Sequence, residues 1–144
     1  MQLNDLQKYK SQFNYIGIKE ASTYLRMQGV DRYFRKQILE SFERQSIIIR
    51  YAGPSEFGIR FYDNINAKAL GRYVFTTFAS TTRNRLAIKI QWNKMTQLKQ
   101  WQIKEGAVII QGAAARQGIG LEGMKSQIYV NELENLIFSH QSIV

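Results

Sequence analysis

The chain has 144 residues, no cysteine and one histidine, and its 44% hydrophobic and 22% charged residues are typical of a globular domain with its own core. The lack of cysteine excludes disulfides, thiolate metal sites and cysteine nucleophiles. With only His140, a histidine triad, a multi-histidine metal site and a two-histidine ribonuclease are excluded as well. No apolar run approaches the ~18–20 residues of a membrane span, and the first residues lack the apolar stretch of a signal peptide, so we expect a soluble domain without a membrane span.

The first 45 residues are predicted to form a helical layer. Apolar residues continue at helical spacing up to Gly29, which closes one helix, and Asp31 is placed to cap the next. The positions that define the helices are Leu3, Leu6, Lys10 and Phe13, then Ile18, Ala21 and Leu25, then Val30, Phe34, Ile38 and Phe42.

From residue 46 the apolar residues recur at every second position, which is typical of strands. The predicted strands are Ser46–Tyr51, Phe57–Phe61, Tyr73–Phe78, Leu86–Ile90, Lys99–Ile103, Ala107–Gln111 and Gln127–Val130, followed by a short helix over Glu132–Phe138. We therefore predict one α+β domain over residues 1–144. Its helical layer spans 1–45 and its sheet-rich, mainly antiparallel core spans 46–144.

Alternation within the predicted strands indicates which polar residues share a face of the sheet. Ile128 is expected to point into the core, which sends Gln127 to the opposite face. The apolar residues of their own strands send Arg60 and Arg85 outward in the same way. Polar side chains from distant strands are therefore expected to line one cleft.

The net charge of +9 is unevenly distributed. The stretch from residue 64 to residue 104 contains no carboxylate. Its cations are Lys68, Arg72, Arg83, Arg85, Lys89, Lys94, Lys99 and Lys104. Such a stretch carries a positive potential that attracts phosphate groups, which favours a nucleotide, a nucleic acid or an acidic protein as the partner.

Between Phe57 and Val130 a series of short motifs follows a definite order. The series is Arg60-Phe61, Gly71-Arg72-Tyr73-Val74, Arg85-Leu86-Ala87, Trp101-Gln102-Ile103, Gly112-Ala113-Ala114, a glycine-containing loop at 118–123 and Gln127-Ile128-Tyr129. This series covers roughly half of the chain and resembles the tuberculosis necrotizing toxin family of NAD glycohydrolases, which is related to the ADP-ribosyltransferase fold. It also resembles toxin domains at the C-termini of large surface-exposed or Rhs-type bacterial proteins.

The resemblance implies a role for four residues. Arg60 and Arg85 would hold the diphosphate of NAD, because guanidinium groups bind phosphate oxygens in pairs. Tyr73 would lie at the nicotinamide, and Gln127 would contact the ribose hydroxyl or the attacking water. A glutamine cannot act as a base, which favours hydrolysis over transfer of ADP-ribose. NAD would be the substrate, and no metal or other cofactor is implied.

The sequence departs from the family pattern in several places. Tyr62-Asp63-Asn64 stands where the family has a glycine-rich turn, and Ala114-Ala115 stands for Ala-Pro. A second alignment is open, in which Arg50 is the first-strand arginine and Ser80-Thr81-Thr82 stands for a Ser-Thr-Ser element. The sequence does not choose between Arg50 and Arg60.

Two other classes of function remain open. A toxin ribonuclease acting on tRNA, of the barnase, EndoU, colicin or RelE type, also has helices before an antiparallel sheet, and the cation-rich stretch suits RNA. Its candidate residues are Arg72, Arg83, Arg85, Thr81 and Tyr73. A non-catalytic binding module for an acidic partner is the third class.

A delivered toxin implies a partner and a route. We expect an acidic cognate immunity protein that covers the cleft, because the chain itself carries a net charge of +9. The domain would travel as part of a larger secreted or surface-delivered effector, as in contact-dependent growth inhibition, and would act in the cytoplasm of the target cell.

Overall fold

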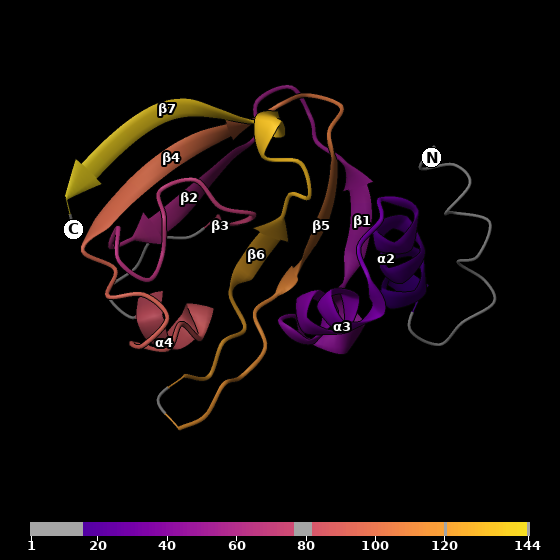
Figure 1. The fold of residues 1–144 in the computed structure, drawn as a ribbon, viewed down its shortest axis with the longest axis horizontal. Helices are drawn as coiled ribbons and strands as arrows, with labels where there is room; N and C mark the ends of the chain where they lie inside the picture. Colours follow the sequence, from indigo (N-terminus) through magenta and orange to yellow (C-terminus); the bar gives the residue numbers. More distant parts are fainter. Residues whose placement is uncertain (1–15, 77–81, 120, 144) are drawn as a thin grey trace.

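The computed structural model describes residues 16–76, 82–119 and 121–143. In this part of the chain two helices precede a seven-stranded sheet, which confirms the predicted α+β class (Figure 1). The elements are α2 (Ile16–Met27), α3 (Arg32–Glu40), β1 (Ile48–Tyr51), β2 (Phe57–Tyr62), β3 (Tyr73–Phe75), α4 (Thr82–Leu86), β4 (Gln97–Ile103), β5 (Val108–Ala113), β6 (Ser126–Tyr129) and β7 (Leu136–Ile143). Two 3-10 turns lie at Arg44–Ser46 and Leu133–Asn135. The helix predicted around Leu3–Phe13 lies outside the described residues, and none of the described helices has the length and apolarity to cross a bilayer.

The sheet has the strand order β1-β5-β6-β3-β2-β4-β7, and every neighbouring pair is antiparallel. Strands β6 and β3 therefore lie near the middle, although they are separated in the sequence. Their register pairs Gln127 with Phe75 and Tyr129 with Tyr73, and Phe75 also pairs with Ile59 of β2. The glutamine that the sequence singles out thus lies on a central strand of the sheet.

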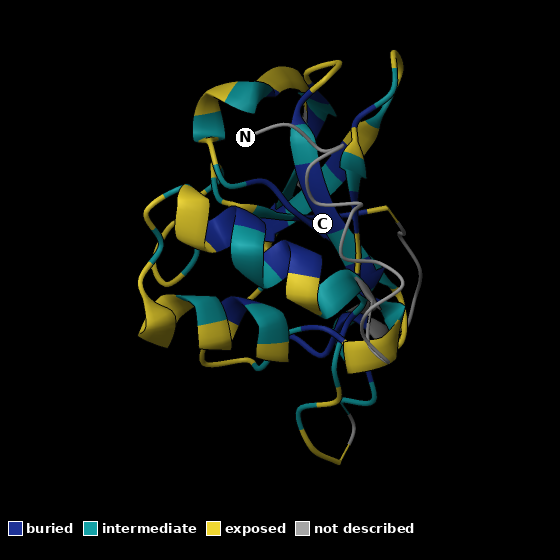
Figure 2. Cartoon of the chain, turned by 90° about the vertical axis from the view of Figure 1, so that its right-hand side faces the viewer, coloured by how far each residue is buried: buried dark blue, intermediate teal, exposed yellow. Residues whose placement is uncertain are grey.

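Helices α2 and α3 cover one face of the sheet at β1, β5 and β6. Asp31 caps α3 as predicted, because its carboxylate accepts the backbone N–H of Phe34 at 2.9 Å. Gly17 allows α2 to pack directly on the chain before β1, since a Cβ at this position would lie 1.6 Å from the carbonyl oxygen of Ile47. Figure 2 views this side and shows buried positions alternating with exposed ones along the helices.

Three groups of buried apolar residues surround the sheet. One lies between α2, α3 and strands β1, β5 and β6, and a second fills the opposite face between β4 and the central strands. The third lies under α4 and contains Phe61, Phe75, Leu86 and Ile88. The first and third groups are on the same face of the sheet. Tyr73 packs against the first group and Phe75 belongs to the third, and residues two positions apart on a strand point to the same side. The space between them forms the cleft described below.

Two predicted elements differ from the structure. The strand predicted at Leu86–Ile90 is wrong: α4 ends at Leu86, and Ala87 has a φ of 53°, which turns the chain. Leu86 and Ile88 are both buried because this turn directs both into the third core, whereas Ile90 is exposed. The helix predicted over Glu132–Phe138 is a 3-10 turn followed by β7, because the apolar residues from Leu136 onward pair with β4.

Candidate functional site

A cleft of about 550 Å³ opens between the end of α3 and the α4 region. The loop between β2 and β3 forms one wall, and the start of the β5–β6 loop closes another side; Figure 1 shows α3, α4 and this last loop at the same end of the sheet. Tyr73, Phe75 and Gln127 contribute the sheet side of the cleft. Its size is within the range of small-molecule sites in proteins.

Gln127 lies at the base of the cleft with 4% of its surface exposed. Its Nε2 donates to the backbone oxygen of Ser41 at 2.9 Å and lies 3.1 Å from the Oγ of the same residue. As predicted, Gln127 lies on the face opposite Ile128, which is in the second core. A buried amide is thereby held against the end of helix α3 by a contact between residues 86 positions apart.

Tyr73 lies beside Gln127 in the cleft. Its hydroxyl is 3.3 Å from Ser41 Oγ, and its ring packs edge-on against Tyr129 with centroids 5.2 Å apart. Burial raises the pKa of the Tyr73 phenol to about 12. The hydroxyl therefore stays protonated at neutral pH and can donate a hydrogen bond.

Arg60 lies on β2, and its guanidinium is directed toward the loop that follows. Its Nε donates to the backbone oxygen of Lys68 at 2.7 Å and its Nη1 to that of Tyr73 at 3.1 Å. Gly71 makes room for it, since a Cβ there would lie 2.3 Å from Arg60 Cζ. Burial lowers the pKa of Arg60, and no carboxylate in the described part of the chain forms an ion pair with it. The cleft is therefore lined by a partly desolvated cation whose hydrogen bonds are to neutral carbonyls.

The two loops around the cleft are tied to the sheet by polar side chains. Oδ1 of Asp63 accepts the backbone N–H groups of residues 65, 66 and 67, and Oδ2 accepts that of Lys94 at 2.8 Å. These hydrogen bonds hold the pKa of Asp63 well below its usual range. Asn93 donates to the backbone oxygen of Phe61 at 2.7 Å. The cleft walls are thus fixed relative to each other.

Of the other candidates from the sequence, Arg72 and Arg83 are described and are not among the described residues that line this cleft. Arg83 donates to the backbone oxygens of Ile88 and Asn93, so it braces the turn after α4. Arg72 is exposed and donates to the backbone oxygen of Asn131. Thr81 and the side chain of Arg85 lie outside the described residues, so their expected roles stay predictions.

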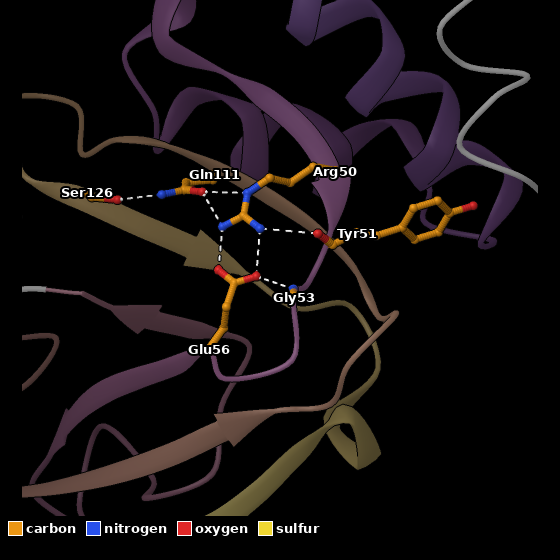
Figure 3. Close-up of polar contacts among 6 residues, drawn as sticks. All are labelled: Arg50, Tyr51, Gly53, Glu56, Gln111 and Ser126. Carbon is orange, nitrogen blue, oxygen red and sulfur yellow. Dashed lines mark hydrogen bonds and ion pairs between the residues drawn. The ribbon is translucent and has the colours of Figure 1, made fainter.

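Arg50 belongs to a separate network (Figure 3). Its Nη1 and Nη2 donate to the two carboxylate oxygens of Glu56 at 2.7 and 2.6 Å, and its Nε donates to Gln111 Oε1 at 3.0 Å. Gln111 in turn donates to Ser126 at 3.1 Å. Arg60, Tyr73 and Gln127 all line the cleft, whereas Arg50 lies in a closed network elsewhere. The prediction that Arg60 shares a face of the sheet with Gln127 is wrong, because Ile59 pairs with Phe75 and Phe75 with Gln127, so these three share one face and Arg60 leaves β2 on the other.

Sequence reasoning missed Ser41, Asp63 and Asn93. The sequence around Asp63 does contain a signal, since Asp followed by Asn residues is typical of a turn in which a carboxylate accepts backbone N–H groups. Ser41 has no comparable signal, because its contact with Gln127 depends on the tertiary fold. In the described part of the chain, no three His, Asp or Glu side chains come together as a metal site.

The fold is shared with several solved structures. No protein-family model matches the sequence, and no curated protein matches it significantly. The structure of Tse6 in complex with Tsi6 aligns with a TM-score of 0.68 at 12% identity, over 89% of this chain and 98% of that one. Tne2 in complex with Tni2 aligns at 0.57 and 11% identity, over 68% and 92% of the two chains. Rhs1-CT in complex with its cognate immunity protein RhsI1 aligns at 0.52 and 10% identity, over 78% and 94%.

Proposed function

We propose that this chain is an interbacterial toxin domain that hydrolyses NAD to nicotinamide and ADP-ribose. The observation that carries the proposal is the cleft itself, in which the buried amide of Gln127, the protonated phenol of Tyr73 and the uncompensated cation of Arg60 lie together. The fold supports the toxin part of the proposal, since three solved proteins that share it were each solved in a complex, one of them with a cognate immunity protein.

The reaction breaks the bond between C1′ of the ribose and the ring nitrogen of nicotinamide. A water oxygen bonds to C1′, the bond electrons leave with nicotinamide as a neutral base, and the water loses one proton to solvent. As this bond breaks, the nicotinamide ring loses its positive charge and positive charge develops on the ribose, which becomes oxocarbenium-like. The protein therefore has to hold the diphosphate, place the ribose and orient the water, and it need not supply a strong acid.

The charges along the cleft suit an anionic dinucleotide. Arg60 and Lys68 line it, and no Asp or Glu is among its described lining residues. A diphosphate that replaces water at Arg60 gains charge-assisted hydrogen bonds in a desolvated place, where they are stronger than at an exposed surface. The absence of a lining carboxylate also favours water over an activated protein acceptor, because no described group there is placed to act as a base.

Aromatic side chains in the cleft offer surfaces for the two bases of NAD. Trp92 is 47% exposed and lines the cleft together with Tyr73 and Phe75. Flat apolar rings of this kind stack well on nicotinamide and adenine. We assign the part of the cleft at Tyr73 and Gln127 to the nicotinamide ribose of NAD, because hydrolysis requires hydrogen-bonding side chains next to C1′.

The proposed partner is an acidic immunity protein that covers the cleft. A net charge of +9 favours such a partner by electrostatic attraction. The domain would be delivered as part of a larger secreted or surface-exposed effector and would act in the cytoplasm of the target cell.

The test compares substrates with the purified protein. Incubation with NAD should release nicotinamide and ADP-ribose in equal amounts, and total tRNA treated in parallel should stay intact. Discrete tRNA cleavage without nicotinamide release would replace the proposal by the ribonuclease alternative. Coexpression with an acidic protein from the same source should restore growth of a host that the domain alone kills.

A further inference from the structure

We infer that Ser41, in the helical layer, is a positioning residue that fixes the orientation of the Gln127 amide and so directs its Oε1 to the reacting ribose. The kinetic part of this inference rests on the proposed NAD hydrolysis. Its structural part concerns only the contact between the end of α3 and the centre of strand β6, and can be tested without any substrate.

The orientation of the amide follows from the kind of atom it faces. The two ends of a glutamine amide differ in that Nε2 only donates and Oε1 only accepts. The backbone oxygen of Ser41 can only accept, and it lies 2.9 Å from Nε2. Flipping the amide would set two acceptors against each other, so this contact favours the orientation in which Nε2 faces α3.

The hydroxyl of Ser41 strengthens this arrangement. Ser41 Oγ donates its single proton to the backbone oxygen of Ile38 at 2.6 Å. Its lone pairs are therefore directed away from Ile38, where Gln127 Nε2 lies at 3.1 Å and the Tyr73 hydroxyl at 3.3 Å. One hydroxyl thus links the end of a helix to both residues that we assign to the nicotinamide ribose.

The consequence concerns Oε1. Because Nε2 faces Ser41, Oε1 lies on the other side of the same planar amide, and Gln127 and Ser41 both line the cleft. An acceptor in that place can take a hydrogen bond from a ribose hydroxyl or from the attacking water. The helical layer is therefore part of the proposed active site, since Ser41, the residue that caps the end of α3, supplies the group that orients Gln127.

The experiment uses three variants of the full chain. Ser41→Ala removes the hydroxyl, Ser41→Thr keeps it, and Ser46→Ala is the matched control. Ser46 also donates to a backbone oxygen three residues earlier, at 2.6 Å, and accepts a backbone N–H from Ala113, but it does not line the cleft. Ser41→Cys, whose thiol is a weak hydrogen-bonding group of similar shape, repeats the test if the alanine variant does not fold.

Two readouts separate positioning from general destabilisation. In NMR spectra the side-chain NH₂ of Gln127 is assigned by its disappearance in Gln127→Glu. We expect its resonances to shift and its protons to exchange faster in Ser41→Ala, and to stay unchanged in Ser46→Ala. With NAD we expect kcat to fall about three- to tenfold in Ser41→Ala, the factor that one hydrogen bond is worth, with KM within about twofold and recovery in Ser41→Thr.

Unchanged Gln127 resonances in Ser41→Ala would overturn the inference, and so would an equal loss of kcat in Ser46→Ala. If the parent protein releases no nicotinamide, the proposed function fails instead, and the NMR comparison alone then decides the positioning.

Discussion

Two arginines on strands that follow each other in the sequence, but lie apart in the sheet, have opposite surroundings. Arg50 on β1 donates to both oxygens of Glu56 and to Gln111, so its charge is neutralised and most of its donors are used. Arg60 on β2 donates to two backbone oxygens, and no described carboxylate pairs with it. The pKa of Arg50 is raised by its hydrogen bonds to Glu56, whereas burial lowers that of Arg60.

The difference shows how a structural arginine can be distinguished from one suited to bind an anion. A cation that is already paired with a carboxylate gains little from a second anion. Moving Arg50 toward a substrate would also break its partly buried ion pair with Glu56. A cation held by neutral carbonyls in a partly desolvated cleft gains much more from a phosphate. The sequence alone left Arg50 and Arg60 as equal candidates, and their surroundings favour Arg60 in the proposed reaction.

Of the variants at the two arginines, Arg60→Ala should have the larger effect on activity. We expect Arg60→Ala to lower kcat/KM for NAD by about 10- to 100-fold, because charge-assisted hydrogen bonds to the diphosphate are lost. Under conditions in which Arg50→Ala is folded, its kcat/KM should stay within about threefold of that of the parent. Circular dichroism of both variants serves as the folding control, and a larger activity loss in Arg50→Ala would reverse the assignment.

The same pair should show the opposite order in stability. Arg50→Ala leaves Glu56 without its bidentate partner, and we expect the free energy of unfolding to fall by about 1–3 kcal/mol. Urea denaturation measures this loss. Glu56→Gln should lower the free energy of unfolding by less, since the amide oxygen still accepts one hydrogen bond from Arg50. An unchanged urea midpoint in Arg50→Ala would show that the network of Figure 3 does not stabilise the fold.

The Arg50 network also predicts a pH dependence. Arg50 lowers the pKa of Glu56 to about 2 from the ordinary 4.5. The unfolded chain therefore binds this proton at a higher pH than the folded one, so the stabilisation is complete above pH 4.5 and is lost as the pH falls toward 2. The difference in unfolding free energy between the parent and Glu56→Gln should shrink across this window, and a constant difference would contradict the pairing.

The smallest effect is expected at Tyr73. Tyr73→Phe removes a hydroxyl near Ser41 Oγ but keeps the ring that packs on Tyr129, so kcat should fall only about threefold. Since the phenol has a pKa of about 12, the parent rate should show no titration of this group below pH 10. Steady-state rates at several pH values test both statements.

Much of the sheet could be predicted because its strands alternate clearly. The face of Gln127 followed from its neighbour Ile128, and the cap at Asp31 followed from its type and place. Residues 86–90 misled the prediction because a turn at Ala87 buries alternate residues just as a strand would. The apolar run after Leu136 is a strand only because the edge of β4 is available to it.

The site was less predictable than the fold for a physical reason. Arg60 and Arg50 differ only in their partners, and the partner of Arg50 is a glutamate six positions away whose side chain returns across a turn. Ser41 meets Gln127 across 86 residues, so only the packed helical layer brings them together. Residue types and spacing indicate which groups are suited to the chemistry, and tertiary contacts decide which of them are free to perform it.

The most direct test of the proposed active site compares two glutamines on adjacent strands of the sheet. Gln127 lines the cleft, whereas Gln111 on β5 lies in the Arg50 network. With NAD as substrate, we expect Gln127→Ala to lower nicotinamide release by about 100-fold or more, as when a preorganised polar group is removed from a reacting centre. We expect Gln111→Ala to remain close to the parent. Equal rates in the parent and Gln127→Ala, with both folded, would contradict the assignment of this cleft as the active site.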